Sequence, residues 1–377
     1  MRGLRAAALT ATVVLLAGGC ARLTGEQDVT ARWFDRTAEV VAAVGGPDPV
    51  ATRTWALAWW AADRATEGSA DPDGALAAAV HDVLVAVAPD RREALDEALE
   101  DGDHTDAGLA DGRRAAAAVL AERAGDGLTV AEVNRPYTPR PEATGTYRPT
   151  PPDLVPGQQA GEGDATPLLL TELPDPGPPV RPGSARYATD LAEVRRLGER
   201  GSTGRTAEQT EVALFWAPSL VTLYTDVLRP FVGPLDARAA AELLGDFHRV
   251  SLDAQLAVYR AKYAYEAWRP VTALREAGLA DWTPLVVTPP QPEHPSGHTA
   301  YAAAAASVLQ ARLGDRRSSL TVDGVTREFD GWDQLVQENV DGRVWGGVHL
   351  RTSDEAGAAL GYQVAANGLA RLAQWGR

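Results

Sequence analysis

Lys262 is the only lysine in the chain, and its surroundings suggest a specific use for it. Lysine and arginine together number 36, so the other 35 cations are arginines. Arg269 follows seven residues later in AKYAYEAWRP, and seven residues make two turns of an α-helix. We therefore expect both on one face of a helix that ends at Arg269, because Pro270 disfavours helical geometry before it. An ammonium beside a guanidinium fork suits an oxyanion such as phosphate, although an ordinary solvated helix face is the commoner explanation.

A second group with chemical potential is the tetrapeptide Pro295-Ser296-Gly297-His298, which leads into an alanine-rich helix. Backbone N–H groups at a helix N-terminus attract anions, Ser296 adds a hydroxyl donor, and Gly297 permits close backbone approach. His298 stands where it could pass a proton to a bound oxyanion. A helix cap with a surface histidine explains the tetrapeptide equally well.

The third group is GRVWGGVH, which contains Arg343 and His349. The two are six residues apart and would lie on different faces of a helix, but Gly346 and Gly347 predict a turn that brings both toward one point. The arginine fork suits two oxygens of an oxyanion, and the histidine suits attack on phosphorus or coordination of a metal-oxo centre. A buried histidine beside a structural arginine is the alternative.

In this order and spacing, the three groups resemble the signature of type-2 phosphatidic acid phosphatases, bacterial class A acid phosphatases and vanadium-dependent haloperoxidases. The surrounding segments are similar to the bacterial haloperoxidase branch: AKYAYEAWRPVTALREAG, DWTPLVVTPPQPEHPSGHT, GRVWGGVHLRTSDEAG, EQTEVALFWA, SARYATDLAEVRRLG and GLADGRRAAAAVLAERAGDG. The resemblance covers nearly all of the chain after residue 19.

The resemblance implies a role for each motif residue. Lys262, Arg269, Ser296, Gly297 and Arg343 would hold the oxygens of a bound oxyanion. His298 would be the acid–base residue. His349 would be the apical ligand of a vanadate cofactor, or the phosphorylated nucleophile of a phosphatase. Three fixed cations match a trianionic group, and no metal cation is required.

One position departs from the phosphatase pattern, in which an aspartate four residues after the last histidine orients its ring. Ser353 stands there, and Asp354 follows it. Asp354 would reach His349 only if the local turn shifts, and a backbone carbonyl could orient the ring instead. We interpret His294 as a loop residue at the mouth of the site. His81, His104 and His248 have no motif around them and are expected to be structural or exposed.

The sequence pattern around these residues predicts an all-α fold, in which two stacked helical bundles are joined by a Pro-rich extended wrap. Residues 29–130 should form the first bundle, 131–205 the wrap, and 206–377 the domain with the anion site. Thirteen of the 26 prolines fall between residues 136 and 182, which excludes a helix there. Leucines 168–170, with Tyr137 and Tyr147, favour a wrap anchored on the helices over a disordered linker. Residues 55, 59 and 60 are tryptophans expected in the core, and SLTVDGVTREF predicts a short hairpin.

The formal charge of −15 and the pI near 4.9 argue against nucleic acid as a partner. Residues 1–19 look like a signal peptide, with two arginines before the apolar run Ala6–Leu16. LLAGGC resembles a bacterial lipobox and makes Cys20, the only cysteine, a candidate lipidation site, with residues 20–28 as a tether. We therefore expect a lipoprotein on the extracytoplasmic face of the cell membrane. Secretion with a free thiol is the alternative.

These observations predict a vanadate-dependent haloperoxidase that oxidises halide with hydrogen peroxide. In that activity Lys262 would polarise the peroxide and His298 would take and return protons. The first alternative is an acid phosphatase of the same superfamily, acting on phosphomonoesters through a phosphohistidine at His349. The second alternative is a non-catalytic lipoprotein that retains the fold.

Overall fold

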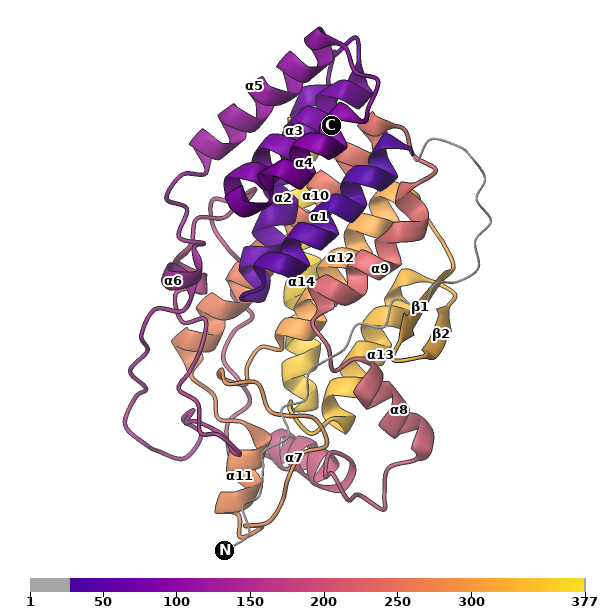
Figure 1. The fold of residues 1–377 in the computed structure, drawn as a ribbon. Coiled ribbons are helices and arrows are strands. Elements are labelled where there is room, and N and C mark those ends of the chain that lie inside the picture. Colours follow the sequence, from indigo (N-terminus) through magenta and orange to yellow (C-terminus); the bar gives the residue numbers. More distant parts are fainter. Residues whose placement is uncertain (1–27, 376–377) are drawn as a thin grey trace, which may run out of the picture.

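The computed structural model describes residues 28–375, and regular structure in that range is almost entirely helical (Figure 1). Its only sheet is a hairpin of β1 (Ser318–Val322) and β2 (Val325–Phe329), paired antiparallel. The predicted all-α class and the predicted hairpin are confirmed. The predicted signal peptide and the candidate lipidation site Cys20 lie outside the described residues.

The first helical bundle is built from short helices with well-formed N-caps. Asp28, Asp71 and Thr105 each accept a backbone N–H from the first turn of the helix that follows, which satisfies one of its free donors. Its three predicted core tryptophans are at most 3% exposed. The helices are α1 (Val29–Val44), α2 (Asp48–Thr66), α3 (Pro72–Val87), α4 (Arg92–Glu100), α5 (Asp106–Glu122) and α6 (Val130–Val133).

The Pro-rich segment after α6 is an ordered wrap. Between α6 and α7 (Ala185–Leu197) it holds only one short 3₁₀ turn, Glu162–Asp164. Backbone N–H groups of the three leucines 168–170 donate to the buried carboxylate of Asp253 on α10, at 2.6, 3.0 and 2.9 Å. The first two leucines and Tyr147 are buried, so the expected apolar anchors are present. α7 itself lies inside the stretch that the sequence predicts to be extended.

The second part of the chain surrounds one long helix, α10. Thr206 and Gln209 form a capping box at the start of α8. The sequence pattern predicts no helix at α11 or α13. The helices are α8 (Ala207–Phe215), α9 (Leu220–Val232), α10 (Ala237–Tyr265), α11 (Pro270–Glu276), α12 (Gly297–Leu313), α13 (Trp332–Trp345) and α14 (Arg351–Gln374).

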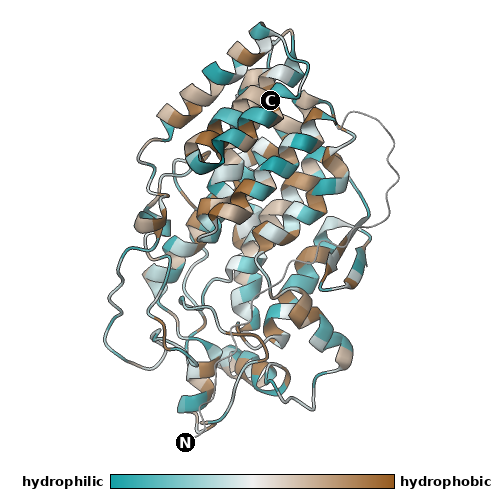
Figure 2. Cartoon of the chain, viewed as in Figure 1, coloured by the Kyte–Doolittle hydropathy of each residue, from teal (hydrophilic) through white to brown (hydrophobic). Residues whose placement is uncertain are grey.

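α10 joins the two bundles because it packs against α2 on one side and against α12 and α14 on the other. One continuous hydrophobic core therefore runs from α1 to α14. The helices carry hydrophilic and hydrophobic residues along their lengths, as amphipathic helices around a shared core do (Figure 2). Within residues 28–375, no helix combines the length and apolarity that crossing a bilayer requires.

The prediction that Lys262 and Arg269 share a helix face is wrong. α10 ends at Tyr265, and Glu266 takes a left-handed conformation with φ of 49°. The wrap contacts the chain at this point, because Thr146 pairs with Ala267 as an isolated β-bridge and the Tyr147 N–H donates to the Glu266 carbonyl at 2.7 Å. Arg269 is instead the N-cap of α11.

Candidate active site

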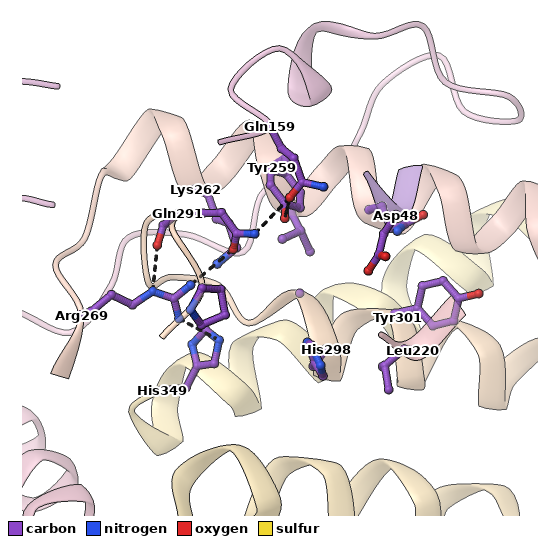
Figure 3. A pocket seen from close by; sticks show the side chains of 14 residues that line it. Asp48, Gln159, Leu220, Tyr259, Lys262, Arg269, Gln291, His298, Tyr301 and His349 are labelled. Atoms are coloured by element: carbon purple, nitrogen blue, oxygen red, sulfur yellow. Dashed lines mark hydrogen bonds between the residues drawn. The ribbon is translucent and has the colours of Figure 1, made fainter. Parts of the chain in front are cut away.

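A cavity of about 110 Å³ lies where the C-terminal part of α10, the N-terminus of α12 and the loop before α14 meet the first residue of α2. Five of the seven predicted motif residues line it: Lys262, Arg269, Gly297, His298 and His349. Figure 3 shows Lys262, Arg269 and His349 on one side of it. Ser296 and Arg343 are buried behind this lining rather than part of it. The remaining lining residues are Asp48, Gln159, Leu220, Gln255, Val258, Tyr259, Pro289, Gln291 and Tyr301.

Lys262 is 1% exposed and lies in the last turn of α10. Its Nζ donates to the carbonyl oxygens of Pro292 at 2.6 Å and Glu293 at 3.1 Å. Burial, and then the charge of Arg269, lower the pKa of Lys262 well below its usual value. The ammonium is therefore held by neutral dipoles, and an anion in the cavity would stabilise its charged form.

Arg269 connects the two loops that form the cationic side of the cavity. Its Nε donates to the Gln291 carbonyl at 2.7 Å, and its Nη1 donates to the Val348 carbonyl at 2.9 Å. The same Nη1 lies 3.1 Å from Nε2 of His349. Arg269 lies outside α10 but still lines the cavity, because its hydrogen bonds to these two loops fix its guanidinium.

Arg343 lies behind the cavity lining, in the last turn of α13, and the predicted glycine turn follows it. Gly347 has φ of 81°, a conformation that favours glycine, and the reversal directs His349 into the cavity. Nη1 of Arg343 donates to the Trp216 carbonyl at 3.0 Å, while its buried Nε has no hydrogen-bond partner among the described residues. Burial lowers the pKa of Arg343 to about 10.

The Ser-Gly-His group forms the N-terminus of α12, as predicted. A Cβ on Gly297 would have only Val258 within 4 Å, at 3.7 Å, so the glycine leaves space beside the cavity. His298 Nε2 lies 3.2 Å from the Pro218 carbonyl oxygen, which requires the proton of a neutral ring on Nε2 and leaves the lone pair on Nδ1. Burial, and then Arg343, lower the pKa of His298 well below its usual value, so the ring is a neutral base.

Glu293, not Asp354, orients His349. Its Oε1 accepts hydrogen bonds from His349 Nδ1 at 3.1 Å and from the Leu350 N–H at 2.9 Å, and its Oε2 accepts one from Ser353 Oγ at 2.6 Å. A proton on Nδ1 leaves the lone pair of the neutral ring on Nε2, the atom beside Arg269. The phosphatase-like spacing was misleading because the orienting carboxylate comes from the loop before α12.

Asp354 is fully buried but has a different neighbour, the hydroxyl of Ser296. Burial raises the pKa of Asp354 well above its usual value, and this serine opposes the rise. Its position behind Ser296 makes it a support for the α12 N-terminus rather than for the His349 ring.

The other histidines do not line the cavity. His294 is 3% exposed, with Nδ1 3.1 Å from Ser353 Oγ and Nε2 3.0 Å from the Gly177 carbonyl oxygen, so the predicted position at the mouth is wrong. His248 is buried and stacked on Trp55, and His81 lies between two aspartates. The structural roles expected for these two fit their surroundings.

The charges around the cavity favour an anion. Lys262, Arg269 and Arg343 are fully buried cations, and the two nearby carboxyl groups, Glu293 and Asp354, both have pKa values raised by burial. The unpartnered Arg343 Nε, the His349 lone pair and the α12 N-terminus supply the donors and the ligand atom that a tetrahedral oxyanion requires. Vanadate or phosphate fits this donor set.

Comparisons with known proteins agree with this geometry. Residues 247–375 match the family model of the VCPO second helical-bundle domain. The structure resembles a bacterial vanadium-dependent iodoperoxidase, with 20% identity, a TM-score of 0.76, and coverage of 91% of this chain and 97% of that one. It also resembles a bacterial vanadium-dependent chloroperoxidase in the apo form (16% identity, TM-score 0.68, 88% and 94% coverage) and one in the holo form (17%, 0.65, 91% and 93%).

A search of curated proteins gives no significant match. The matched region, residues 247–375, contains every residue of the three motifs, and the structural likeness extends over nine-tenths of the chain. The chain therefore has the fold of the bacterial vanadium haloperoxidases, and its C-terminal third matches the VCPO second helical-bundle domain.

Proposed function

We propose that this protein is a vanadate-dependent haloperoxidase, with His349 as the ligand of the cofactor. The observation that carries the proposal is the Glu293–His349 pair, which leaves the Nε2 lone pair beside three buried cations. The names of the similar structures, an iodoperoxidase and chloroperoxidases, support the same activity.

Vanadate, when bound, would supply a Lewis-acidic centre that activates hydrogen peroxide for two-electron oxidation of halide. Lys262, Arg269 and Arg343 would hold its oxygens, together with the Gly297 N–H, whereas the Ser296 N–H already donates to the Ser353 carbonyl at 3.0 Å. Since these cations lie in a low-dielectric site, they act on a bound oxyanion more strongly than they would in water. Lys262, as a compact point charge, would polarise the oxygen that halide attacks.

His298 would move the protons of this reaction. Its neutral ring carries a lone pair on Nδ1, and it lies between the cationic side of the cavity and Asp48 (Figure 3). A neutral imidazole can take a proton from hydrogen peroxide as it binds and return it to the leaving oxygen.

A phosphatase activity is the second candidate, because the same His349 lone pair suits in-line attack on a phosphomonoester. His298 would then protonate the leaving oxygen, and water would release phosphate from the phosphohistidine. The oxyanion-binding residues serve both reactions equally.

The test compares both activities in one preparation stripped of bound anion. Monochlorodimedone halogenation with vanadate, hydrogen peroxide and bromide should be observed, and it should be lost in His349→Ala. His104→Ala is the matched control, since that histidine lies outside the cavity. Hydrolysis of p-nitrophenyl phosphate that vanadate inhibits, without halogenation, would establish the phosphatase. Neither activity, with no vanadate binding, would establish the non-catalytic alternative.

We also propose export and lipid anchoring through Cys20, on the signal-like residues 1–19 and the lipobox resemblance. Expression in a bacterium that processes lipoproteins should place the protein in the membrane fraction. Cys20→Ala should release it from that fraction, and an unchanged distribution would contradict the anchor.

A further inference from the structure

The side of the cavity away from His349 has a different chemical character. Figure 3 shows Asp48, Tyr301 and Leu220 together on that side, with His298 between them and the three cationic-side residues. Asp48 is the first residue of α2, so this side comes partly from the first helical bundle. The motif chemistry does not use any of these three residues.

Asp48 presents a carboxylate to the cavity. Ser219 Oγ donates to its Oδ1 at 2.9 Å and is the only side chain among the described residues that hydrogen-bonds to it. Burial raises the pKa of Asp48, whereas its position at the N-terminus of α2 favours the charged form, and a cation in the cavity would favour that form further. Its second oxygen, Oδ2, is left to interact with an occupant of the cavity.

Two further lining residues suit a cation. Gln255 is 8% exposed, lines the cavity, and its buried Oε1 accepts no hydrogen bond from the described residues. Tyr301 also lines the cavity, near Asp48 (Figure 3), and an aromatic ring can attract a positive charge. A carboxylate, a free amide oxygen and an aromatic ring are the groups that recognise an organic ammonium.

We propose that the Asp48 side is a subsite for the primary ammonium group of a small organic amine. The ammonium would donate to the carboxylate of Asp48 and to Gln255 Oε1, and would contact the ring of Tyr301. Ammonium binding at this subsite requires no oxidised halogen, so it does not depend on the proposed function.

The cavity, of about 110 Å³, favours a small amine with a short aliphatic stem. A free halide would be repelled by Asp48 and drawn to the cationic side, which keeps the two occupants apart.

The test is direct binding of propylammonium to anion-stripped protein, measured by calorimetry and by saturation-transfer NMR. Propan-1-ol and propionate serve as the neutral and anionic analogues. Propylammonium should bind at least tenfold more tightly than propan-1-ol, because a charged hydrogen-bonded pair in a buried site is worth that ratio or more. Inorganic phosphate should tighten propylammonium binding, since the two charges would share one low-dielectric cavity.

Asp48→Asn should remove the preference for propylammonium over propan-1-ol, because it keeps the Ser219 contact and removes the charge. Asp90→Asn, which changes the same charge on an exposed turn, should leave the preference intact. Equal binding of the two compounds by the unmodified protein, or an unchanged preference in Asp48→Asn, would overturn the subsite. Iodide oxidation assayed without any amine tests the haloperoxidase proposal separately. A protein that binds propylammonium but does not oxidise iodide would contradict the haloperoxidase proposal and leave the subsite proposal intact.

Discussion

Replacing Glu293 with alanine should weaken oxyanion binding although Glu293 does not line the cavity. Its Oε1 accepts from both His349 Nδ1 and the Leu350 N–H, and both donors are buried. Alanine would remove the acceptor of these two donors and of the Ser353 hydroxyl, at a cost of about 1–3 kcal/mol for each buried donor left unsatisfied. It would also free the ring to place its proton on Nε2, which removes the lone pair from the cavity side.

The expected loss in affinity for vanadate or phosphate is about 10- to 100-fold, the usual effect of removing the partner that orients a ligating histidine. This corresponds to about 1.4–2.7 kcal/mol of binding free energy. Glu293→Gln should lose less. The Leu350 N–H keeps a carbonyl oxygen at the Oε1 position, so the contact with His349 survives without its charge.

Calorimetric titration with vanadate and with phosphate measures these affinities, and ¹⁵N NMR of the imidazoles reports which nitrogen of His349 carries the proton. Asp354→Asn is the comparison, because the phosphatase-like spacing would assign the same role to that residue. Affinity in Glu293→Ala equal to that of the unmodified protein would refute the argument. A larger loss and a changed tautomer in Asp354→Asn would refute it as well.

Three further predictions concern buried side chains. Lys262→Arg should retain part of the vanadate affinity while steady-state halogenation falls at least tenfold, because a planar guanidinium replaces a compact ammonium in a buried, packed position. Unchanged turnover would show that the ammonium has no special role. Burial lowers the pKa of His248 to about 3, so below pH 6.5 the unfolded chain binds a proton that the folded chain refuses, and stability falls as the pH drops toward 3. Urea unfolding at pH 7 and pH 4.5 should show that the free energy of unfolding falls by about 2.7 kcal/mol less in His248→Phe than in the unmodified protein. An equal fall in both proteins would contradict this prediction. Asp253→Asn should turn an amide N–H donor toward the backbone N–H groups of the leucines 168–170 and lower the free energy of unfolding by about 1–3 kcal/mol. Limited proteolysis within residues 134–184 should then become faster, and unaltered cleavage would mean that other contacts hold the wrap.

Much of the site could be predicted from the sequence because its residues occur in three compact groups. Local sequence features predicted three properties that the structure has: a glycine turn before His349, a helix that begins at Gly297, and cationic side chains gathered around one cavity. The prediction that Lys262 and Arg269 share one helix was wrong. The helix ends between them, next to Ala267, which pairs with Thr146 from more than a hundred residues earlier in the chain.

The residues that could not be predicted are those whose roles depend on tertiary contacts. Glu293 has no helical or strand periodicity around it, and only the fold brings it to His349. Asp48 looks like an ordinary acidic residue in the first turn of a helix, which is a common place for a carboxylate. No local pattern connects it with a cavity whose other walls lie more than a hundred residues away in sequence.

The cavity brings together residues from distant parts of the chain. Every predicted oxyanion-binding residue lies within residues 247–375, whereas Asp48, Gln159 and Leu220 come from earlier segments. Substitutions at those three positions could therefore change which molecules enter the cavity without altering the predicted oxyanion-binding residues. Such substitutions would allow the range of accepted compounds to diversify while the oxyanion site stays the same.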